Sequence, residues 1–398
     1  MVEFDIIIVG GGLVGASLAC ALKNQALKIA LIDKSPLNAN PLHNFDARAL
    51  ALSLPSIECL QMLDVWPKIS DAASIIKAVH VSKQGHFGIT KISASEHQLS
   101  ALGYVVNADD LNIALNQVVE TLSNVTLFRP EEIVKVEKRD QGWAIQLSNQ
   151  KKLSTKLLVA ADGAESVLRK QQGIEVKVQD YQQTAIVANI ALNQSHQGIA
   201  YERFLEKGSI AMLPFGENCV KCVCVVPSDQ IEILKAQSDK AFLENIQHQF
   251  GHRLGFFKQS GNRIFYPLKN ICAENLYSDR FVLIGNAANT LHPIAAQGFN
   301  LGIRDAATLA EVLVQAQNAH QDIGSVEVLR SYADRRIDDH RAIRYFTDSL
   351  AEPHVFQWLG IVVSEWVMPF KRRIAERGLG RHQNLSKLCR GVSLTQDP

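Results

Sequence analysis

The sequence lacks an excess of charge of either sign, an even set of cysteines and, beyond its first residues, any long uncharged apolar run. Lys and Arg number 41 and Asp and Glu 40, which gives a formal net charge of +1 and offers no indication of a nucleic-acid partner. Seven cysteines are an odd number, and most stand inside apolar segments, which argues against a disulfide framework. We therefore expect a protein of a reducing, cytoplasmic compartment that binds no nucleic acid.

The sequence contains no segment expected to form a membrane-spanning helix, so only the protein surface is expected to contact a membrane. Residues 6–22 carry no charge, but Glu3 and Asp5 stand where a signal peptide has basic residues, and three consecutive glycines interrupt the run. No other segment supplies the roughly 18 uncharged apolar residues that a spanning helix needs. Any membrane association is thus expected to be peripheral, at the inner face.

Strand and helix patterns are unevenly distributed along a chain of ordinary globular composition. At 398 residues and 47% hydrophobic content, the chain predicts an α/β protein of about two or three units with a sizeable core. Alternating strands and helices at both ends bracket a β-rich middle. We predict a discontinuous nucleotide-binding domain, an inserted β-rich domain and a helical, basic C-terminal region. In that order, the predicted ranges are 1–72, 104–178 and 270–345; 73–103 and 179–269; and 346–398.

The first motif is a glycine-rich turn inside a predicted strand–helix–strand unit. Gly10, Gly12 and Gly15 follow an apolar strand and open a helix of small residues. In such a turn, the second glycine lets a pyrophosphate approach the free N–H groups of the helix start. Asp33 ends the second strand, where a carboxylate holds the adenosine ribose. The unit predicts an adenine dinucleotide site and does not separate NAD from FAD.

Two further motifs follow apolar strands later in the chain. Asp162 and Gly163 come directly after one of them, a pattern that by itself predicts only a turn. Gly285 and Asn286 end another, and after a Pro loop a helix is predicted from Gly298. This arrangement again directs a helix N-terminus at an electron-rich ligand.

In this order and spacing, the three motifs resemble the fingerprints of the group A flavoprotein aromatic hydroxylases, over nearly the whole chain. Within that family the chain most resembles the ubiquinone-biosynthesis branch, the 2-polyprenyl-6-methoxyphenol hydroxylases. The segments that carry this likeness are 45–53, 79–82, 85–88, 101–106, 204–214 and 291–302. The resemblance implies a discontinuous Rossmann-like FAD-binding domain, an inserted β-sheet substrate domain and a C-terminal helical region.

The activity that the resemblance implies is hydroxylation of the aromatic ring of a polyprenyl-methoxyphenol. FAD is the implied cofactor, NAD(P)H the diffusible reductant and O2 the co-substrate, with the flavin carrying the chemistry as a hydroperoxide. The alternatives are a hydroxylase of another ring position or phenol and a non-catalytic FAD-binding subunit of a quinone-biosynthesis complex. A nicotinamide dehydrogenase with one Rossmann domain does not need the motif at 280–302, and the presence of this motif argues against that class.

The family's cofactor contacts carry over onto matching positions of this chain. These are Gly10, Gly12, Leu13, Gly15 and Asp33 for the ADP part, Arg48 toward the flavin, Asp162, Gly163 and Arg169 for FAD and the nicotinamide donor, Gly285 and Asn286 at the ribityl chain, and Gly298, Phe299 and Asn300 beneath the isoalloxazine. Asn286 departs from the family's usual Asp, but it keeps a carbonyl acceptor for a ribityl hydrogen bond. Ala296 replaces the usual Gly.

No side chain is assigned the chemistry itself. Candidates for contact with substrate or flavin are His292, Pro293, Tyr201 and Tyr266, together with Arg203 and Phe215 of the β-rich region; each has a structural alternative, as a loop brace or a core residue. Cys219, Cys222 and Cys224 suggest a zinc site, but no fourth ligand stands near and the run alternates like a strand, so buried thiols and no metal are expected.

The C-terminal region combines apolar and aromatic residues with basic ones. Trp358 and Trp366 lie in apolar stretches, and Lys371, Arg372 and Arg373 follow them. Aromatic residues beside cations suit a lipid headgroup boundary. We expect this region to face an anionic membrane or a partner subunit; the alternative is a helix that packs its tryptophans into the core.

Overall fold

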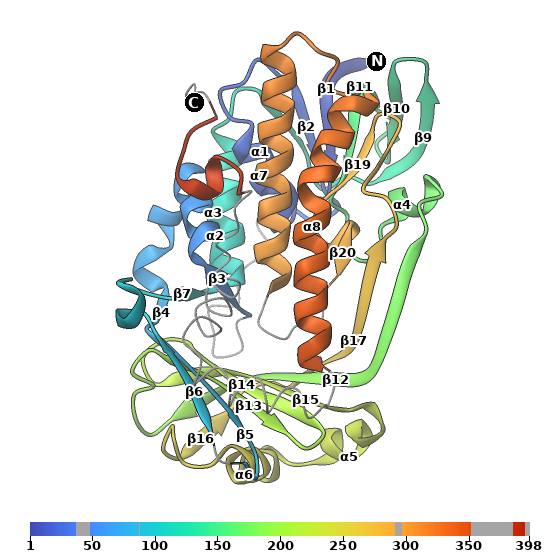
Figure 1. The fold of residues 1–398 in the computed structure, drawn as a ribbon. Coiled ribbons are helices and arrows are strands. Elements are labelled where there is room, and N and C mark those ends of the chain that lie inside the picture. Colours follow the sequence, from blue (N-terminus) through green and yellow to red (C-terminus); the bar gives the residue numbers. More distant parts are fainter. Residues whose placement is uncertain (37–47, 87, 291–296, 352–384, 395–398) are drawn as a thin grey trace.

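The computed structural model describes residues 1–36, 48–86, 88–290, 297–351 and 385–394. Two β-sheets form the two main parts of the molecule, and a three-stranded sheet lies between them (Figure 1). Helices cover the first sheet in the upper part of the view, and two shorter helices lie beneath the second sheet. The expected α/β fold with an inserted β-sheet is confirmed.

The first sheet, here sheet A, has a parallel centre in the order β19–β11–β1–β2–β8. Ile6, Ile7 and Ile8 of β1 are all fully buried, because helices cover both faces of a parallel sheet and its strands are therefore continuously apolar. The strands of sheet A are β1 (Val2–Val9), β2 (Ile29–Ile32), β8 (Val125–Phe128), β9 (Ile133–Arg139), β10 (Gly142–Leu147), β11 (Lys152–Ala160), β18 (Tyr277–Ser278) and β19 (Phe281–Leu283).

Sheet A is covered by helices from both ends of the chain. The N-terminal helix α1 packs against both α3 and the long helix α7, and α8 packs on α7. The helices of this part are α1 (Leu13–Ala21), α2 (Leu54–Met62), α3 (Ala108–Glu120), α4 (Val167–Gln171), α7 (Gln297–Asn318) and α8 (Val326–Ala351), with the 3-10 turns η1 (Trp66–Lys68), η2 (Ser70–Ala72), η5 (Gly285–Ala287) and η7 (Leu388–Arg390).

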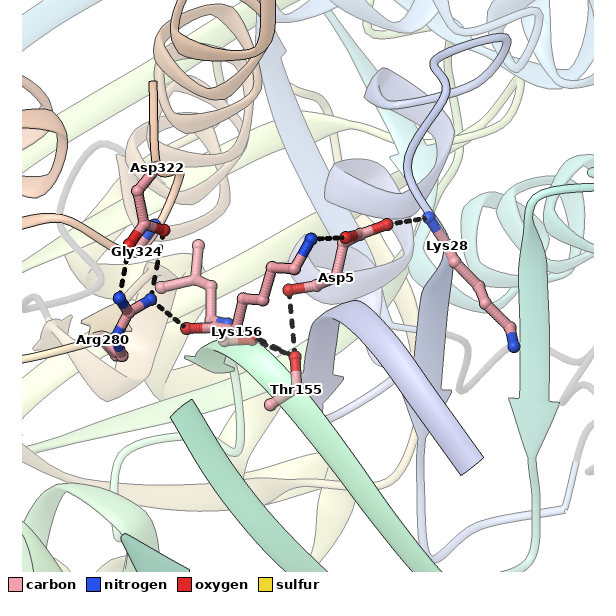
Figure 2. Close-up of polar contacts among 8 residues, drawn as sticks. Asp5, Lys28, Thr155, Lys156, Arg280, Asp322 and Gly324 are labelled. Carbon is pink, nitrogen blue, oxygen red and sulfur yellow. Dashed lines mark hydrogen bonds and ion pairs between the residues drawn. The ribbon is translucent and has the colours of Figure 1, made fainter. Parts of the chain in front are cut away.

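A polar network fixes the stagger of the central strands (Figure 2). The Asp5 carboxylate of β1 accepts the backbone N–H of Lys28 at 2.9 Å and pairs with the Lys156 ammonium at 2.8 Å. Arg280, which precedes β19, donates to the Lys156 carbonyl at 3.4 Å and pairs with Asp322. The residue before β2 is thus bonded to the middle of β1, and the residue before β19 to the middle of β11. These contacts align the four strands so that their carboxyl ends lie at the same edge of the sheet.

The second large sheet, sheet C, is antiparallel apart from one parallel pair, β5 with β13, and has one covered face. Ile186, Ala188 and Ile190 of β12 are buried against α6, whereas Ala185 and Val187 point to the opposite face. The strands are β5 (Ala78–Lys83), β6 (Ile89–Ser93), β12 (Val176–Leu192), β13 (Ile199–Leu205), β14 (Gly208–Pro214), β15 (Cys219–Pro227), β16 (Phe257–Ser260), β17 (Ile264–Ala273) and β20 (Asn289–Thr290), with η4 (Ser228–Gln230), α5 (Ile231–Ala236) and α6 (Asp239–Phe250).

The small sheet B joins the two parts. It consists of β3 (Ala49–Ser53), β4 (Ser74–Ile76) and β7 (Gly103–Asn107), and the turn η3 (Ser95–His97) follows β6. Ala49 and Ala51 of β3 pack in one apolar cluster with Ala200 of β13. The carboxyl edge of sheet A lies toward the face of sheet C that is opposite α6 (Figure 1).

The predicted domain boundaries fall inside continuous elements. Strand β12 (Val176–Leu192) crosses the boundary set at residue 178, and β17 (Ile264–Ala273) crosses the one at 269. Helix α8 runs to Ala351, past the boundary at 345. We retain the division into three units as a proposal, in which the long strands β12 and β17 belong to both of the first two.

Candidate active site

The glycine-rich turn is built so that three backbone segments meet closely. Gly10 has a φ of +100°, and a Cβ there would lie 2.3 Å from the Ala161 carbonyl oxygen. A Cβ at Gly15 would lie 1.9 Å from the Gly10 carbonyl oxygen. Gly12 caps α1 without a side-chain hydrogen bond and borders open space. The N–H groups at Gly12 and Leu13 therefore remain available for an anion at the positive end of the helix.

Asp33 closes this turn from the end of β2. Its carboxylate accepts the Gly11 N–H and the Ser35 N–H, each at 2.6 Å. The guanidinium of Arg129, which follows β8, lies 3.5 Å away and donates to the Asn116 side chain at 2.8 Å. Asp33 is therefore held by the protein at the end of β2, and Arg129 positions it.

The Asp-Gly turn follows β11, next to the glycine-rich turn. One carboxylate oxygen of Asp162 accepts the Leu168 N–H at 3.3 Å. The other oxygen is buried and has no hydrogen-bond partner in the described part of the chain. Gly163, at a φ of +91°, borders open space. A buried acceptor beside open space fits a hydroxyl or N–H donor of a bound cofactor.

Arg169 joins the Asp-Gly turn to the Gly285 turn. It is 2% exposed, and its guanidinium donates to the carbonyl oxygens of Ala164 at 2.8 Å and Ala287 at 2.7 Å. These bonds use the side chain to hold two turns together. The structure thus gives Arg169 a positioning role, which the sequence pattern did not separate from a cofactor contact.

The Gly285 turn is fixed from behind by a buried carboxylate. Gly285 has a φ of +60°, and its N–H donates to Asp305 of α7 at 3.0 Å. The other oxygen of Asp305 accepts from Arg336 and lies against His340 of α8, both at 2.7 Å. Although burial opposes its charge, His340 and Arg336 hold the pKa of Asp305 below its ordinary value. Asn286, held on this turn, is exposed.

The start of α7 is anchored to sheet B. The Asn300 side-chain oxygen accepts the Ser53 N–H at 2.9 Å and the Ser56 hydroxyl at 2.7 Å, and its NH2 donates to the Ala51 carbonyl at 2.9 Å. Asn300 therefore positions the helix. Gly298 borders open space and Phe299 is half-buried among the residues that the structure describes.

Arg48 stands beside this region, immediately before β3. Its side chain is 64% exposed and pairs with Asp109 of α3 at 3.2 Å. A long exposed cation at the site edge has the freedom to reach a ligand, since an exposed ion pair contributes little. His292 and Pro293 lie outside the described residues.

The aromatic candidates separate onto the two faces of sheet C. Tyr201 packs edge-on against Phe250 of α6 with ring centroids 5.5 Å apart, and Arg203 donates to the Gln249 carbonyl. Both face α6, away from the turns of sheet A, which removes them from the residues proposed to touch the substrate. Tyr266 is paired with Ala185 on the opposite face and is 44% exposed. Phe215 packs in the cluster of β3.

The three cysteines of β15 do not form a common site. Cys222 and Cys224 are buried on the α6 side, whereas Cys219 lies an odd number of positions away and points to the other face. Burial raises the pKa of Cys224 to about 12 and that of Cys219 to about 11. Among the described residues, no group of three metal-ligating side chains comes together.

Sequence reasoning missed three residues that the structure brings to this region: Arg129, Asp305 and Glu202. Arg129 could be placed only once β8 was known to pair with β2, where Phe128 lies beside Ile32. Asp305 had a signal, because it and Arg304 are adjacent charges inside a largely apolar stretch of α7. Glu202 had one too, as an acidic residue on a strand.

The sequence is similar to an FAD-binding family and to several ubiquinone hydroxylases. The FAD binding domain family matches residues 3–346. Ubiquinone hydroxylase UbiL of Rhodospirillum rubrum is 31% identical, with 98% of this chain and 93% of that protein covered. The 3-demethoxyubiquinol 3-hydroxylase of Escherichia coli is 28% identical, with 94% and 98% covered.

Solved structures show the same fold at lower sequence identity. PqsL of Pseudomonas aeruginosa superimposes with a TM-score of 0.76 at 20% identity, over 88% of this chain and 96% of that one. The open start of α1 and the buried Asp162 oxygen, which has no partner in the described part of the chain, fit FAD. The chain belongs to the FAD binding domain family of flavoprotein monooxygenases, in the branch that includes the ubiquinone hydroxylases.

Proposed function

We propose that this protein hydroxylates the aromatic ring of a polyprenyl phenol in ubiquinone biosynthesis, using FAD, NAD(P)H and O2. The observation that carries the proposal is similarity to a ubiquinone hydroxylase along 98% of the chain, joined to a cofactor edge that lies toward the face of sheet C opposite α6. Bound FAD, reduced by NAD(P)H, supplies the activation of O2.

The residues of this chain have distinct proposed tasks toward FAD. Gly12 and Leu13 offer N–H groups to the pyrophosphate, and Asp33 takes the ribose hydroxyls. Asp162 and Asn286 offer acceptor oxygens along the rest of the cofactor. The open start of α7 at Gly298 stabilises negative charge at the flavin ring.

The face of sheet C opposite α6 is the proposed substrate surface. Its middle row is apolar and half-buried, whereas the row behind it is buried against α6. This row consists of Val81, Ala211, Val187 and Val223 around Glu202. A low-polarity wall suits an aromatic ring with an apolar tail and limits water at the reacting atoms.

The test uses purified protein, NADPH or NADH, and 2-methoxy-6-farnesylphenol as the probe. A bound flavin spectrum, probe-stimulated NAD(P)H oxidation and a product with one added oxygen support the proposal. Flavin binding without any product would indicate the alternative, a non-catalytic FAD-binding subunit.

A peripheral membrane or partner contact through the C-terminal region is part of the proposal. In the described part of the chain no helix is long and apolar enough to cross a bilayer. Trp358, Trp366, Lys371, Arg372 and Arg373 lie outside the described residues, so their sequence alone supports this contact. Co-sedimentation with anionic liposomes should be lost at high salt and in the Lys371/Arg372/Arg373→Glu variant; equal recovery of both proteins would contradict it.

A further inference from the structure

Glu202 of β13 lies on the face of sheet C that is turned toward the cofactor edge. Its neighbour Tyr201 packs against Phe250 of α6, so Glu202 points to the opposite side. Ala200, two residues before it on the same face, packs in one cluster with Ala51 of β3. The Ala51 carbonyl in turn accepts the Asn300 side chain at the start of α7. Glu202 is therefore on the strand that connects directly to the anchored helix start.

The surroundings of Glu202 on this face are apolar. Ala211 of β14 is its cross-strand partner, Val81 of β5 lies on its other side, and Val223 follows across β14. The charged side chains in register on this face of the neighbouring strands are Lys83 of β5 and Lys221 of β15. An acidic side chain in the middle of such a surface contributes nothing to apolar packing.

The Glu202 carboxyl group is enclosed but incompletely satisfied. The residue as a whole is half-buried, yet its Oε1 atom is fully buried and has no hydrogen-bond partner in the described part of the chain. The Ser209 hydroxyl donates a hydrogen bond to the carboxyl group. Burial raises the pKa of Glu202 to about 7, while the bond from Ser209 acts in the opposite direction. A buried, unpaired acceptor is costly unless a ligand completes it.

We propose that Glu202 binds the hydroxyl group of the phenolic substrate through Oε1 and accepts its proton during the reaction. This inference rests on the proposed function and adds a requirement, that the substrate must carry a free phenolic hydroxyl. The O–H bond of the phenol breaks, its proton passes to Oε1, and a phenolate faces a neutral carboxylic acid. The phenolate ring is richer in electrons and therefore reacts faster with an electrophilic oxygen.

The acid–base properties of Glu202 suit this task. A general base works best when its pKa lies near the working pH, because it is then ionised often enough and still basic enough. A carboxyl group with its ordinary pKa would be a much weaker base toward a phenol. The apolar surroundings thus serve both to bind the ring and to raise the basicity of the carboxylate.

The principal experiment compares Glu202→Gln with the wild type and with Glu206→Gln, an exposed control in the next turn. The probe is 2-methoxy-6-farnesylphenol, and flavin content is measured alongside kcat and KM. We expect Glu202→Gln to lower kcat by about 100-fold or more with unchanged flavin content, and Glu206→Gln to match the wild type. Equal kcat in the wild type and Glu202→Gln would overturn the inference.

Ser209→Ala provides a variant that keeps the carboxylate. Removing the hydroxyl donor raises the pKa of Glu202 further, so the acid limb of the kcat profile should move to higher pH; an unmoved limb would count against Glu202 as the base. The two hypotheses fail separately. A wild type that makes no hydroxylated product refutes the proposed function, whereas hydroxylation at equal rates by wild type and Glu202→Gln refutes only the role of Glu202.

Discussion

The substitution Asp305→Asn tests how the Gly285 turn is held in place. One buried carboxylate serves two elements, because one oxygen accepts the Gly285 N–H and the other binds Arg336 and His340. Asp305 is fully buried. The Asn amide has the same shape as the carboxylate but no charge. Its NH2 group would also replace one of the two accepting oxygens and would face an N–H donor. Arg336 loses one of its two carboxylate partners, the other being Asp339 at 2.6 Å.

We expect Asp305→Asn to lower the free energy of unfolding by about 3–5 kcal/mol, the range seen when one partner of a buried ion pair is removed. Urea denaturation followed by tryptophan fluorescence measures this change. Asp338→Asn, at an exposed position of α8, the helix that carries Arg336 and His340, is the control and should change stability by no more than about 0.5 kcal/mol.

The pH dependence of this loss has a definite sign. Because the pKa of Asp305 is lowered on folding, its contribution is present above the unfolded value of 3.8 and disappears as the pH falls through the lower folded value. The difference between wild type and variant should therefore shrink in acid below that value and stay constant from pH 5 to 8. A loss below about 1 kcal/mol at neutral pH, with normal flavin content, would refute the account of this turn.

Three further predictions concern the cofactor and the sheet face. Gly15→Ala should destabilise the fold, because its Cβ would lie 1.9 Å from the Gly10 carbonyl oxygen. Gly12→Ala has open space around the new methyl group, so this variant should fold normally and lose FAD. Thermal unfolding and flavin content distinguish the two variants, and equal behaviour would contradict the assigned roles. Asn286→Asp should retain flavin while Asn286→Leu should lose flavin or turnover, and an active Leu variant would remove this side chain from the site. Burial raises the pKa of Glu202 from 4.5 to about 7, so Glu202 ionises at lower pH in the unfolded chain than in the folded one. The free energy of unfolding, measured by urea denaturation, should therefore fall by about 3 kcal/mol as the pH rises between these values and then level off. Glu202→Gln should not show this fall, and the same fall in the variant would mean that Glu202 is not its source.

The cofactor edge could be predicted from the sequence because its signals are local. Continuous apolar runs mark buried parallel strands, and glycines at fixed spacing mark the first turn, which the structure places at Gly10, Gly12 and Gly15. The carboxyl ends of neighbouring parallel strands share an edge, so Asp162 and Gly285 fall beside that turn. The identity of the cofactor needed the order of all three motifs.

The opposite face of the site could not be predicted because it depends on which side of sheet C is covered. Alternation separates Tyr201 from Glu202, but only the packing of Tyr201 against Phe250 of α6 shows which of the two faces that helix. The roles of Asp305 and Arg169 depend on contacts between elements that are 20 and 118 positions apart, and no local pattern encodes these.

The most direct test of the account is the fate of molecular oxygen in a single reaction mixture. Purified, FAD-containing protein is supplied with NAD(P)H, 2-methoxy-6-farnesylphenol and isotopically labelled O2, and the product is analysed by mass spectrometry. The account predicts one labelled oxygen atom on the aromatic ring for each NAD(P)H consumed in coupled turnover. Flavin-dependent NAD(P)H oxidation that yields only hydrogen peroxide and leaves the ring unlabelled would contradict it.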